Sequence, residues 1–225
     1  ATLAAAVDRT LRWAERARNA HARTDDQALF GIVQGGTDPQ LRAEAARRTV
    51  ELGFDGYAVG GLSVGETREE MLPALVATLA ELPEGQPRYL MGVGDPVSIV
   101  EAVAAGVDMF DCVLPTRLAR HGTLLTDAGR LNIRRAEFTR SDDPVSDTCG
   151  CVTCSRYTRG YLRHLMAVGE QAGATLCTIH NLSWMLDLVA ALRSAIRSGT
   201  LAELRDRLVA SHADMAPGGG PSTDR

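Results

Sequence analysis

The chain repeats one pattern four times: a short apolar segment, a glycine-rich turn and, after the first three, a segment with helical periodicity. Short apolar strands that alternate with helices pair in parallel, because each helix is the crossover between two strands. A repeat of roughly thirty residues with glycine-rich turns favours a (β/α) barrel over a doubly wound sheet. The expected strands are 29–33, 57–59, 88–91 and 107–113, and the expected helices are 38–52, 67–82 and 96–105.

Only half of such a barrel is visible in the sequence, since a complete one has eight strands. Residues 1 to 21 form an expected helix with Leu3, Val7 and Leu11 on one face, as if it closed a unit whose strand is absent. An open half barrel exposes two strand edges, which proteins usually avoid. The sequence therefore predicts an α/β fold in which residues 1–145 are the C-terminal half of a (β/α)8 TIM barrel.

Residues 146–215 are predicted to form an appended zinc-binding subdomain with C-terminal helices. Cys149, Cys151 and Cys154 lie close together, and His180 follows one helix length later. Three thiolates and one imidazole complete the tetrahedral shell of zinc and leave no position for a substrate, so the pattern predicts one structural Zn²⁺ per chain. The alternative is buried cysteines with an unrelated histidine, although buried cysteines seldom cluster so tightly. The odd number of cysteines, five, disfavours a disulfide framework.

Several further elements are expected around this cluster. Composition is that of a globular chain, with 45% hydrophobic and 23% charged residues. We find no apolar run long enough to span a membrane, so the expected location is the cytoplasm. The expected elements are a hairpin of strands 123–126 and 130–133, helices 156–169, 182–198 and 201–212, and a disordered tail, 216–225.

All 24 basic residues are arginines. The lack of lysine excludes Schiff-base chemistry and a P-loop lysine, and leaves guanidinium forks for polar recognition. Six arginines lie between residues 116 and 140, opposed by Asp127 and Glu137, in a chain whose net charge is −4. This basic strip fits a phosphate backbone, although a solvated charged surface is the more common explanation of such a pattern.

Catalytic groups of parallel barrels lie at the carboxyl ends of the strands. Asp111 is the ionisable residue within an expected strand end, between apolar Phe110 and Cys112. A carboxylate there is costly unless it is hydrogen-bonded, which makes Asp111 a candidate catalytic group. The alternative is a polar cap for the turn that follows.

Other strand ends offer groups suited to a flat ligand. Gln34 donates and accepts side by side, as a nucleobase edge requires. Gly60, Gly61 and Gly92 let backbone amides approach a ligand closely, but turn geometry alone also explains them. Met91 is either a stacking platform or a core residue.

Five motifs occur in one order between about Trp13 and His212. They are 30–36 (FGIVQGG), 56–66 (GYAVGGLSVGE), 89–94 (YLMGVG), 110–117 (FDCVLPTR) and the Cys-x-Cys-x2-Cys…His set. Together they resemble the bacterial tRNA-guanine transglycosylases, also called queuine tRNA-ribosyltransferases. The family's amino-terminal half, with an Asp-Ser-Gly-Gly-Phe-Gln motif whose aspartate is usually assigned as general acid/base, has no counterpart in this chain.

The resemblance implies an exchange of the wobble guanine in tRNAs with GUN anticodons for 7-aminomethyl-7-deazaguanine, a step towards queuosine. Asp111 would be the nucleophile that forms a covalent aspartyl-ribose intermediate, as the carboxylate of a retaining glycosidase does. Gln34 and the Gly61 amide would bind the purine carbonyl, and Met91 would pack on the base. Gly60 and Gly92 would complete the pocket.

The same resemblance assigns the remaining partners. The Leu62 carbonyl, supported by Glu66, would accept a hydrogen bond from the aminomethyl group. Arg117 and Arg120 would contact the bases beside the flipped guanine, a usual mode of RNA recognition. The partners implied are the tRNA anticodon loop, guanine and its deaza analogue and, at full length, a second copy in a homodimer.

Three other functions remain open at this point. The chain could be a non-catalytic tRNA-binding partner subunit, against which the retained Asp111 argues. A zinc hydrolase is disfavoured by the closed set of four metal ligands. A zinc module that binds nucleic acid alone is disfavoured by the four strand units.

Overall fold

The chain divides into two compact units on either side of the Cys112–Val113 bond. The computed structural model describes residues 2–62 and 65–212. The sequence predicted a boundary near residue 145, but the hairpin packs in the second unit. Its apolar side chains Leu124 and Ile133 join the core of that unit, which accounts for the earlier boundary.

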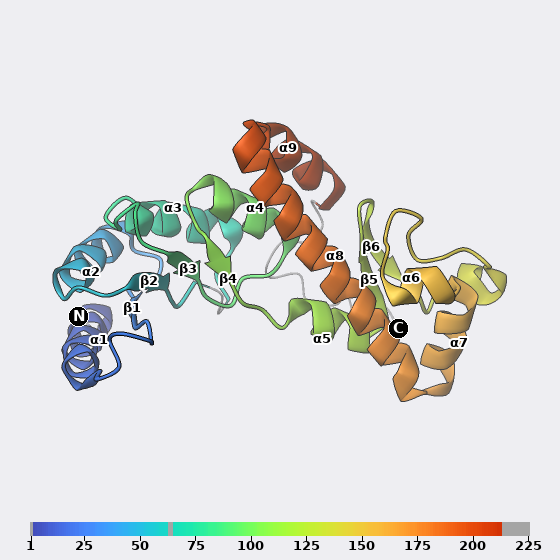
Figure 1. Cartoon of the computed structure of the whole chain (residues 1–225), viewed down its shortest axis with the longest axis horizontal. Coiled ribbons are helices and arrows are strands. Elements are labelled where there is room, and N and C mark those ends of the chain that lie inside the picture. Colours follow the sequence, from blue (N-terminus) through green and yellow to red (C-terminus); the bar gives the residue numbers. More distant parts are fainter. Residues whose placement is uncertain (1, 63–64, 213–225) are drawn as a thin grey trace. The chain divides into compact units, whose positions relative to one another are not determined.

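The first unit holds a four-stranded parallel sheet in the order β1-β2-β3-β4, with helices as crossovers (Figure 1). The predicted alternation of strands and helices is therefore confirmed, and this unit is a mixed α/β structure. Its strands are β1 (Phe30–Val33), β2 (Gly56–Val59), β3 (Arg88–Leu90) and β4 (Met109–Phe110), and its helices are α1 (Thr2–Ala20), α2 (Pro39–Glu51), α3 (Arg68–Leu79) and α4 (Pro96–Ala104).

Side-chain caps fix where the crossover helices begin. Asp38 accepts a hydrogen bond from the Gln40 amide at the start of α2, as its position before a proline predicted. At α3, Thr67 and Glu70 form a capping box. At α4, the side chain of Asp95 accepts a hydrogen bond from the Ser98 amide. Each cap lies in a loop that follows a strand, so the caps also shape the carboxyl edge of the sheet.

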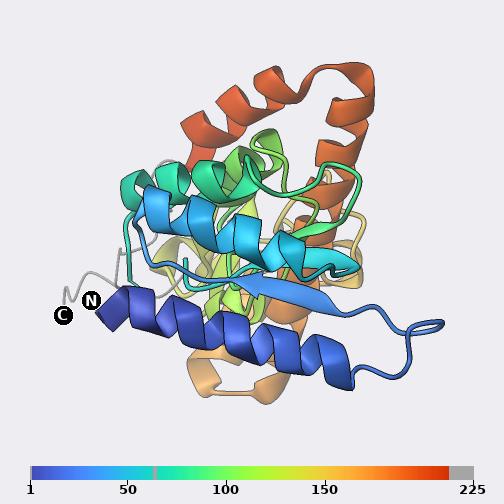
Figure 2. The ribbon, with the colours of Figure 1, turned by 90° about the vertical axis from the view of Figure 1, so that its left-hand side faces the viewer.

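The core of the first unit lies between the sheet and its helices. Val33, Val59 and Leu90 are 0% exposed and hold the ends of the first three strands in place. Helices α1 and α2 run alongside β1 (Figure 2). Leu3, predicted on the buried face of α1, is 44% exposed, whereas Val7 and the rest of that face are packed.

The fourth strand is much shorter than the predicted 107–113. Only Met109 and Phe110 pair with β3. Beyond them the Gly92 amide, which follows β3, donates to the side chain of Asp111. Asp111 therefore begins the segment after the strand, and the sheet ends where the candidate catalytic group starts.

The second unit is a small sheet surrounded by helices. Antiparallel strands β5 and β6 form the predicted hairpin and pack with α7 and α8. Helix α5 was not predicted, because Pro115 was interpreted as a turn residue although proline is common in the first turn of a helix. The elements are α5 (Leu114–Arg120), β5 (Thr123–Thr126), β6 (Gly129–Asn132), the 3₁₀ helix η1 (Ala136–Arg140), α6 (Val152–Arg156), α7 (Arg159–Val168), α8 (Gln171–Ser198) and α9 (Leu201–His212).

Helix α8 is longer than predicted, starting at Gln171 rather than at residue 182. Among the described residues it is the one helix that is long and apolar enough to cross a membrane by length and composition, a property that we did not expect from the sequence. Its buried residues include His180 and Asn181, whose side chains bond to β5. Apolar residues of α8 are also buried, among them Trp184 and Leu188, so the helix packs inside this unit. Helix α9 has the predicted bounds, and the tail, 216–225, lies outside the described residues.

Candidate active site and metal centre

The carboxyl edge of the parallel sheet gathers the predicted site residues of the first unit. Gln34 follows β1, Gly60 follows β2, Met91 follows β3 and Asp111 follows β4. All strand pairs are parallel, so these four positions share one edge. The structure thus brings together residues that the sequence separates widely.

Asp111 is held through one of its two oxygens. The Tyr89 hydroxyl donates to Oδ1 over 2.6 Å, and the Gly92 backbone amide donates to the same atom over 2.8 Å. These bonds, that of Tyr89 first, hold the pKa of Asp111 below its usual value. The Asp111 carboxylate raises the pKa of Tyr89 to about 12, so the phenol stays a donor. Asp111 is exposed, unlike the apolar setting that its neighbours suggested, but it is hydrogen-bonded as expected.

The Gln34 amide lies against the loop that follows β2. A Cβ atom at Gly60 would stand 2.7 Å from Gln34 Nε2, and one at Gly61 would stand 2.6 Å from Gln34 Oε1. Gly61 also has a φ of +69°. A close approach and a left-handed turn therefore both require glycine here. Leu62, the next residue, is fully buried.

A buried arginine that sequence reasoning missed lies beneath these loops. Arg42 of α2 is 0% exposed, and its guanidinium donates to backbone carbonyls after β1 and β2. Burial lowers the pKa of Arg42 to about 10, opposed by the charge of Glu66. The available signal was its position: Arg42, Ala45, Ala46 and Thr49 share the buried face of α2. Tyr89 was also missed, since nothing in the sequence pairs it with Asp111.

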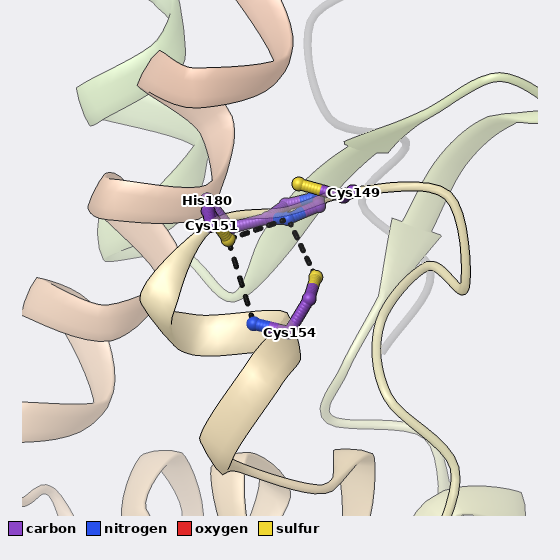
Figure 3. A group of neighbouring side chains, drawn as sticks. All are labelled: Cys149, Cys151, Cys154 and His180. Atoms are coloured by element: carbon purple, nitrogen blue, oxygen red, sulfur yellow. Dashed lines mark hydrogen bonds between the residues drawn. The ribbon is translucent and has the colours of Figure 1, made fainter.

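Three cysteines and one histidine form a compact cluster in the second unit (Figure 3). Cys149 and Cys151 precede α6, Cys154 lies on α6 and His180 lies on α8. Their ligand atoms all lie within 4.8 Å of one another. In a tetrahedron with Zn–S bonds of about 2.3 Å the sulfur atoms stand about 3.8 Å apart, so the donor set fits such an ion. None of the chain's five cysteines, all of which the structure describes, forms a disulfide.

Hydrogen bonds orient His180 towards the thiols. Nδ1 of its ring lies 3.2 Å from Cys154 Sγ and 3.7 Å from Cys151 Sγ. Nε2 lies 2.8 Å from the Leu125 carbonyl oxygen, which can only accept, so Nε2 carries the proton. Burial lowers the pKa of His180 and favours the neutral ring that a metal ligand must have. The predicted metal cluster is thus confirmed as a geometry that could hold a metal ion.

Asn181, which follows His180 on α8, is hydrogen-bonded to residues of two other elements. Its Oδ1 accepts from the Leu125 amide over 2.9 Å, and its Nδ2 donates to the carbonyls of Pro115 and Thr123, each over 3.0 Å. The side chain is 0% exposed and uses its donors and acceptor together. Helix α5 is therefore fastened at its first turn to the same residues that orient the cluster.

Arg117 and Arg120 lie on α5 and are exposed. They are three positions apart on a helix, so both point to one side. Other members of the predicted basic strip have structural contacts. Arg134 donates to the Met166 carbonyl over 2.9 Å, and Arg135 pairs with Glu137 at 3.7 Å. All six arginines of the strip are exposed, and among them Arg134 also links the segment after β6 to α7.

Comparisons with known proteins agree on one family. A family model described as "Queuine tRNA-ribosyltransferase" matches residues 1–214. Curated proteins of that name are 54% identical over 202 residues in Pelotomaculum thermopropionicum (90% of this chain, 54% of the relative), 49% over 214 in Halothermothrix orenii (95% and 57%) and 52% over 202 in Lactococcus lactis (90% and 53%). The chain thus spans about half the length of the curated relatives it matches.

Proposed function

This chain belongs to the queuine tRNA-ribosyltransferase family, and from that premise we propose that it carries the nucleophile and part of the base pocket of a tRNA-guanine transglycosylase. The proposed reaction replaces the wobble guanine of GUN anticodons by 7-aminomethyl-7-deazaguanine. The observation that carries the proposal is the carboxylate of Asp111, held through Oδ1 at the sheet edge that also bears Gln34 and two glycines.

Asp111 acts as the nucleophile. Its second oxygen, Oδ2, attacks C1′ of the wobble ribose, and the C1′–N9 bond breaks with its electron pair on guanine N9, which takes up a proton. The ester that results is opened by the incoming base. Its N9 attacks C1′ and gives up the N9 proton, which balances the proton taken up by guanine, and the C1′–Oδ2 bond breaks to release the carboxylate. An ionised carboxylate suits this step because it needs no activating base, and the bonds that lower the Asp111 pKa keep it ionised at neutral pH.

The base pocket consists of strand-end loops. Gln34 and the Gly61 amide bind the purine carbonyl, and the side chain of Met91, half-buried after β3, packs on the base face beside Gly92. Gly60 gives Gln34 the space that its amide occupies. The Leu62 carbonyl, supported by Glu66, accepts from the aminomethyl group of the incoming base.

The metal centre has a structural role. Cys149, Cys151, Cys154 and His180 hold one Zn²⁺, whose four protein ligands leave no open position for chemistry. The ion would supply folding free energy to this subdomain. Arg117 and Arg120 contact unpaired nucleotides of the anticodon loop beside the flipped guanine.

We extend the proposal to the larger assembly. The four parallel strands form the last half of a (β/α)8 barrel, with the metal centre in an appended subdomain, and the full-length protein is a homodimer. The tRNA substrate implies a cytoplasmic location. We define the completed protein as this chain preceded, in one polypeptide, by the part of the Pelotomaculum relative that it does not match.

A covalent trap tests the proposal. The completed protein should form an RNA adduct that survives on a denaturing gel, and Asp111→Asn should abolish that adduct while tRNA binding remains. Asp108→Asn is the matched control, because Asp108 lies before β4 and its carboxylate bonds to the Arg88 amide. An adduct that persists in Asp111→Asn would reassign the nucleophile.

A further inference from the structure

We propose that Arg42 is a positioning residue for the purine-recognition loops of this protein. No predicted site residue lies on α2, and Arg42 is too deeply buried to meet a substrate. Its guanidinium instead bonds to the backbone on both sides of Gln34 and at Gly60. The inference rests on the proposed function for the identity of the ligand, whereas the loop organisation that it describes does not.

Four hydrogen bonds join Arg42 to two loops. Nε donates to the Gly36 carbonyl over 2.7 Å, and Nη1 donates to the Val33 carbonyl over 3.2 Å, which brackets Gln34. Nη2 donates to the Gly60 carbonyl over 2.8 Å and lies 3.4 Å from the Gly61 carbonyl oxygen. One planar group thus fixes the loop after β1 relative to the loop after β2.

The charge of Arg42 makes a simple packing role a poor explanation. Among the described residues no ion pair joins Arg42 to a carboxylate, although the charge of Glu66 acts on its guanidinium. A buried cation without such a partner costs stability, and an apolar side chain would fill the same space at less cost. The acceptors of its protons among the described residues are backbone carbonyl oxygens, which fits a group that organises the backbone.

Positioning by Arg42 bears directly on recognition of the purine carbonyl. The Val33 and Gly36 carbonyls bracket the backbone of Gln34, which carries the side-chain amide, and the Gly60 carbonyl belongs to the same peptide group as the Gly61 amide. Arg42 therefore fixes the backbone that presents both groups. A ligand whose 6-oxo group meets both amides is preferred over one that lacks it, since buried polar groups would otherwise remain unpaired. Arg42 thereby determines specificity through Gln34 and Gly61.

Hydrogen exchange tests the loop organisation. The Gly60 amide donates to the Val33 carbonyl, and the Val107 amide donates to the Ala102 carbonyl elsewhere in the same unit. In Arg42→Met, Gly60 exchange should accelerate about tenfold or more relative to Val107, both in this chain and in the completed protein. If exchange of the Gly60 and Val107 amides accelerated equally, Arg42 would contribute only to the overall stability of the unit. That result would overturn the proposal.

Base selection tests the specificity role. In the completed protein, Arg42→Met should raise the KM for guanine on the order of 10²-fold while the KM for tRNA changes little. The preference for guanine over 2-aminopurine, which lacks the 6-oxo group, should fall at least tenfold. Arg42→Lys keeps a charge but not the fork, so it should rescue only part of the preference.

The matched control is Arg47→Met, which removes an exposed arginine of the same helix that pairs with Glu81. It should leave Gly60 exchange and base preference unchanged. An unaltered guanine preference in Arg42→Met, assayed where that variant is folded, would overturn the proposal. Failure of the proposed function would appear separately, as no guanine incorporation by the completed protein that retains Arg42.

Discussion

At the scale of single residues, Asp111 differs from an ordinary surface aspartate in the way it is held. Both of its donors, the Tyr89 hydroxyl and the Gly92 amide, bond to Oδ1. The two oxygens of one carboxylate are therefore inequivalent, and Oδ2 is the one that neither donor occupies. Charge-assisted bonds of this length also restrict rotation of the carboxylate, which favours a fixed direction of attack.

Replacing Tyr89 by phenylalanine should raise the pKa of Asp111. The folded-state pKa of Asp111 lies below its usual value, so the linked stabilisation is present above that usual pKa and is lost as the pH falls through the folded one. Tyr89→Phe should move the titration midpoint of the Asp111 carboxyl carbon upwards in NMR. Tyr57→Phe, on the neighbouring strand, is the control. An unchanged midpoint in Tyr89→Phe would show that Tyr89 does not lower the pKa of Asp111.

Residue type alone predicted part of this site. Asp111 and Gln34 stood out because a carboxylate and an amide at strand ends are chemically unusual there. Tyr89 and Arg42 did not, because their roles depend on partners 22 and 18 residues away. The pattern of apolar positions specifies which face of a helix is buried, but not that an arginine on that face meets carbonyl groups.

At the scale of elements, α8 connects the metal ligands to the hairpin and to α5. His180 bonds to Leu125 of β5, and Asn181 bonds to Leu125, Thr123 and Pro115. Adjacent residues of one helix thus contact the cysteine–histidine cluster and α5, the helix that bears Arg117 and Arg120.

The sequence predicted the hairpin and α9 well, because their patterns are local. It missed α5, whose proline was interpreted as a turn residue, and it missed the start of α8, because residues 170–181 were assigned to no element.

Asn181→Leu should destabilise the second unit strongly. The change leaves the Leu125 amide and the carbonyls of Pro115 and Thr123 without their partner, at a cost of about 3 kcal/mol. Urea unfolding followed by the fluorescence of Trp184, which is 7% exposed, would measure it in a Trp13→Phe background.

The matched control for this variant is Asn132→Leu, since Asn132 is exposed and its side chain accepts from the Arg134 amide. We expect a small change there. Equal midpoints for Asn181→Leu and the parent protein would show that these buried bonds add nothing to stability.

Loss of the metal should affect one unit far more than the other. Purified protein should contain about one zinc per chain, and Cys151→Ser should lose it, because structural zinc supplies folding free energy. Amide protection should then fall across residues 113–212 and persist in residues 2–62 and 65–112. Cys112→Ser, outside the cluster, is the control. Full metal content in a Cys151→Ser, Cys154→Ser double variant would refute the assignment.

At the scale of the whole molecule, the chain has two units with separate cores. The parallel sheet of the first unit has an open edge at β1 and another at β4. Among the described strands, β1 and β4 each pair with one neighbour only. Open edges favour association with other strands. The closed barrel that we propose for the completed protein would have no such edges.

We expect this chain alone to exchange no guanine into tRNA above background. Under the proposed function, the general acid/base aspartate belongs to the amino-terminal half that the resemblance implies, and loss of proton transfer costs a factor of about 10² to 10⁴. Incorporation of radiolabelled guanine should return in the completed protein and disappear again in its Asp111→Asn variant. Robust turnover by residues 1–225 would mean that the site is assembled differently.

The order of strands in the sheet also has a consequence for folding kinetics. Each strand pairs with the one that precedes or follows it along the chain, as Phe30 does with Gly56, so each pairing closes a shorter loop than the contact between His180 and Leu125. In the second unit, His180 must instead meet Leu125 across 55 residues. We expect the first unit to fold during synthesis, one strand and helix at a time, and the second to wait until the ribosome has released α8.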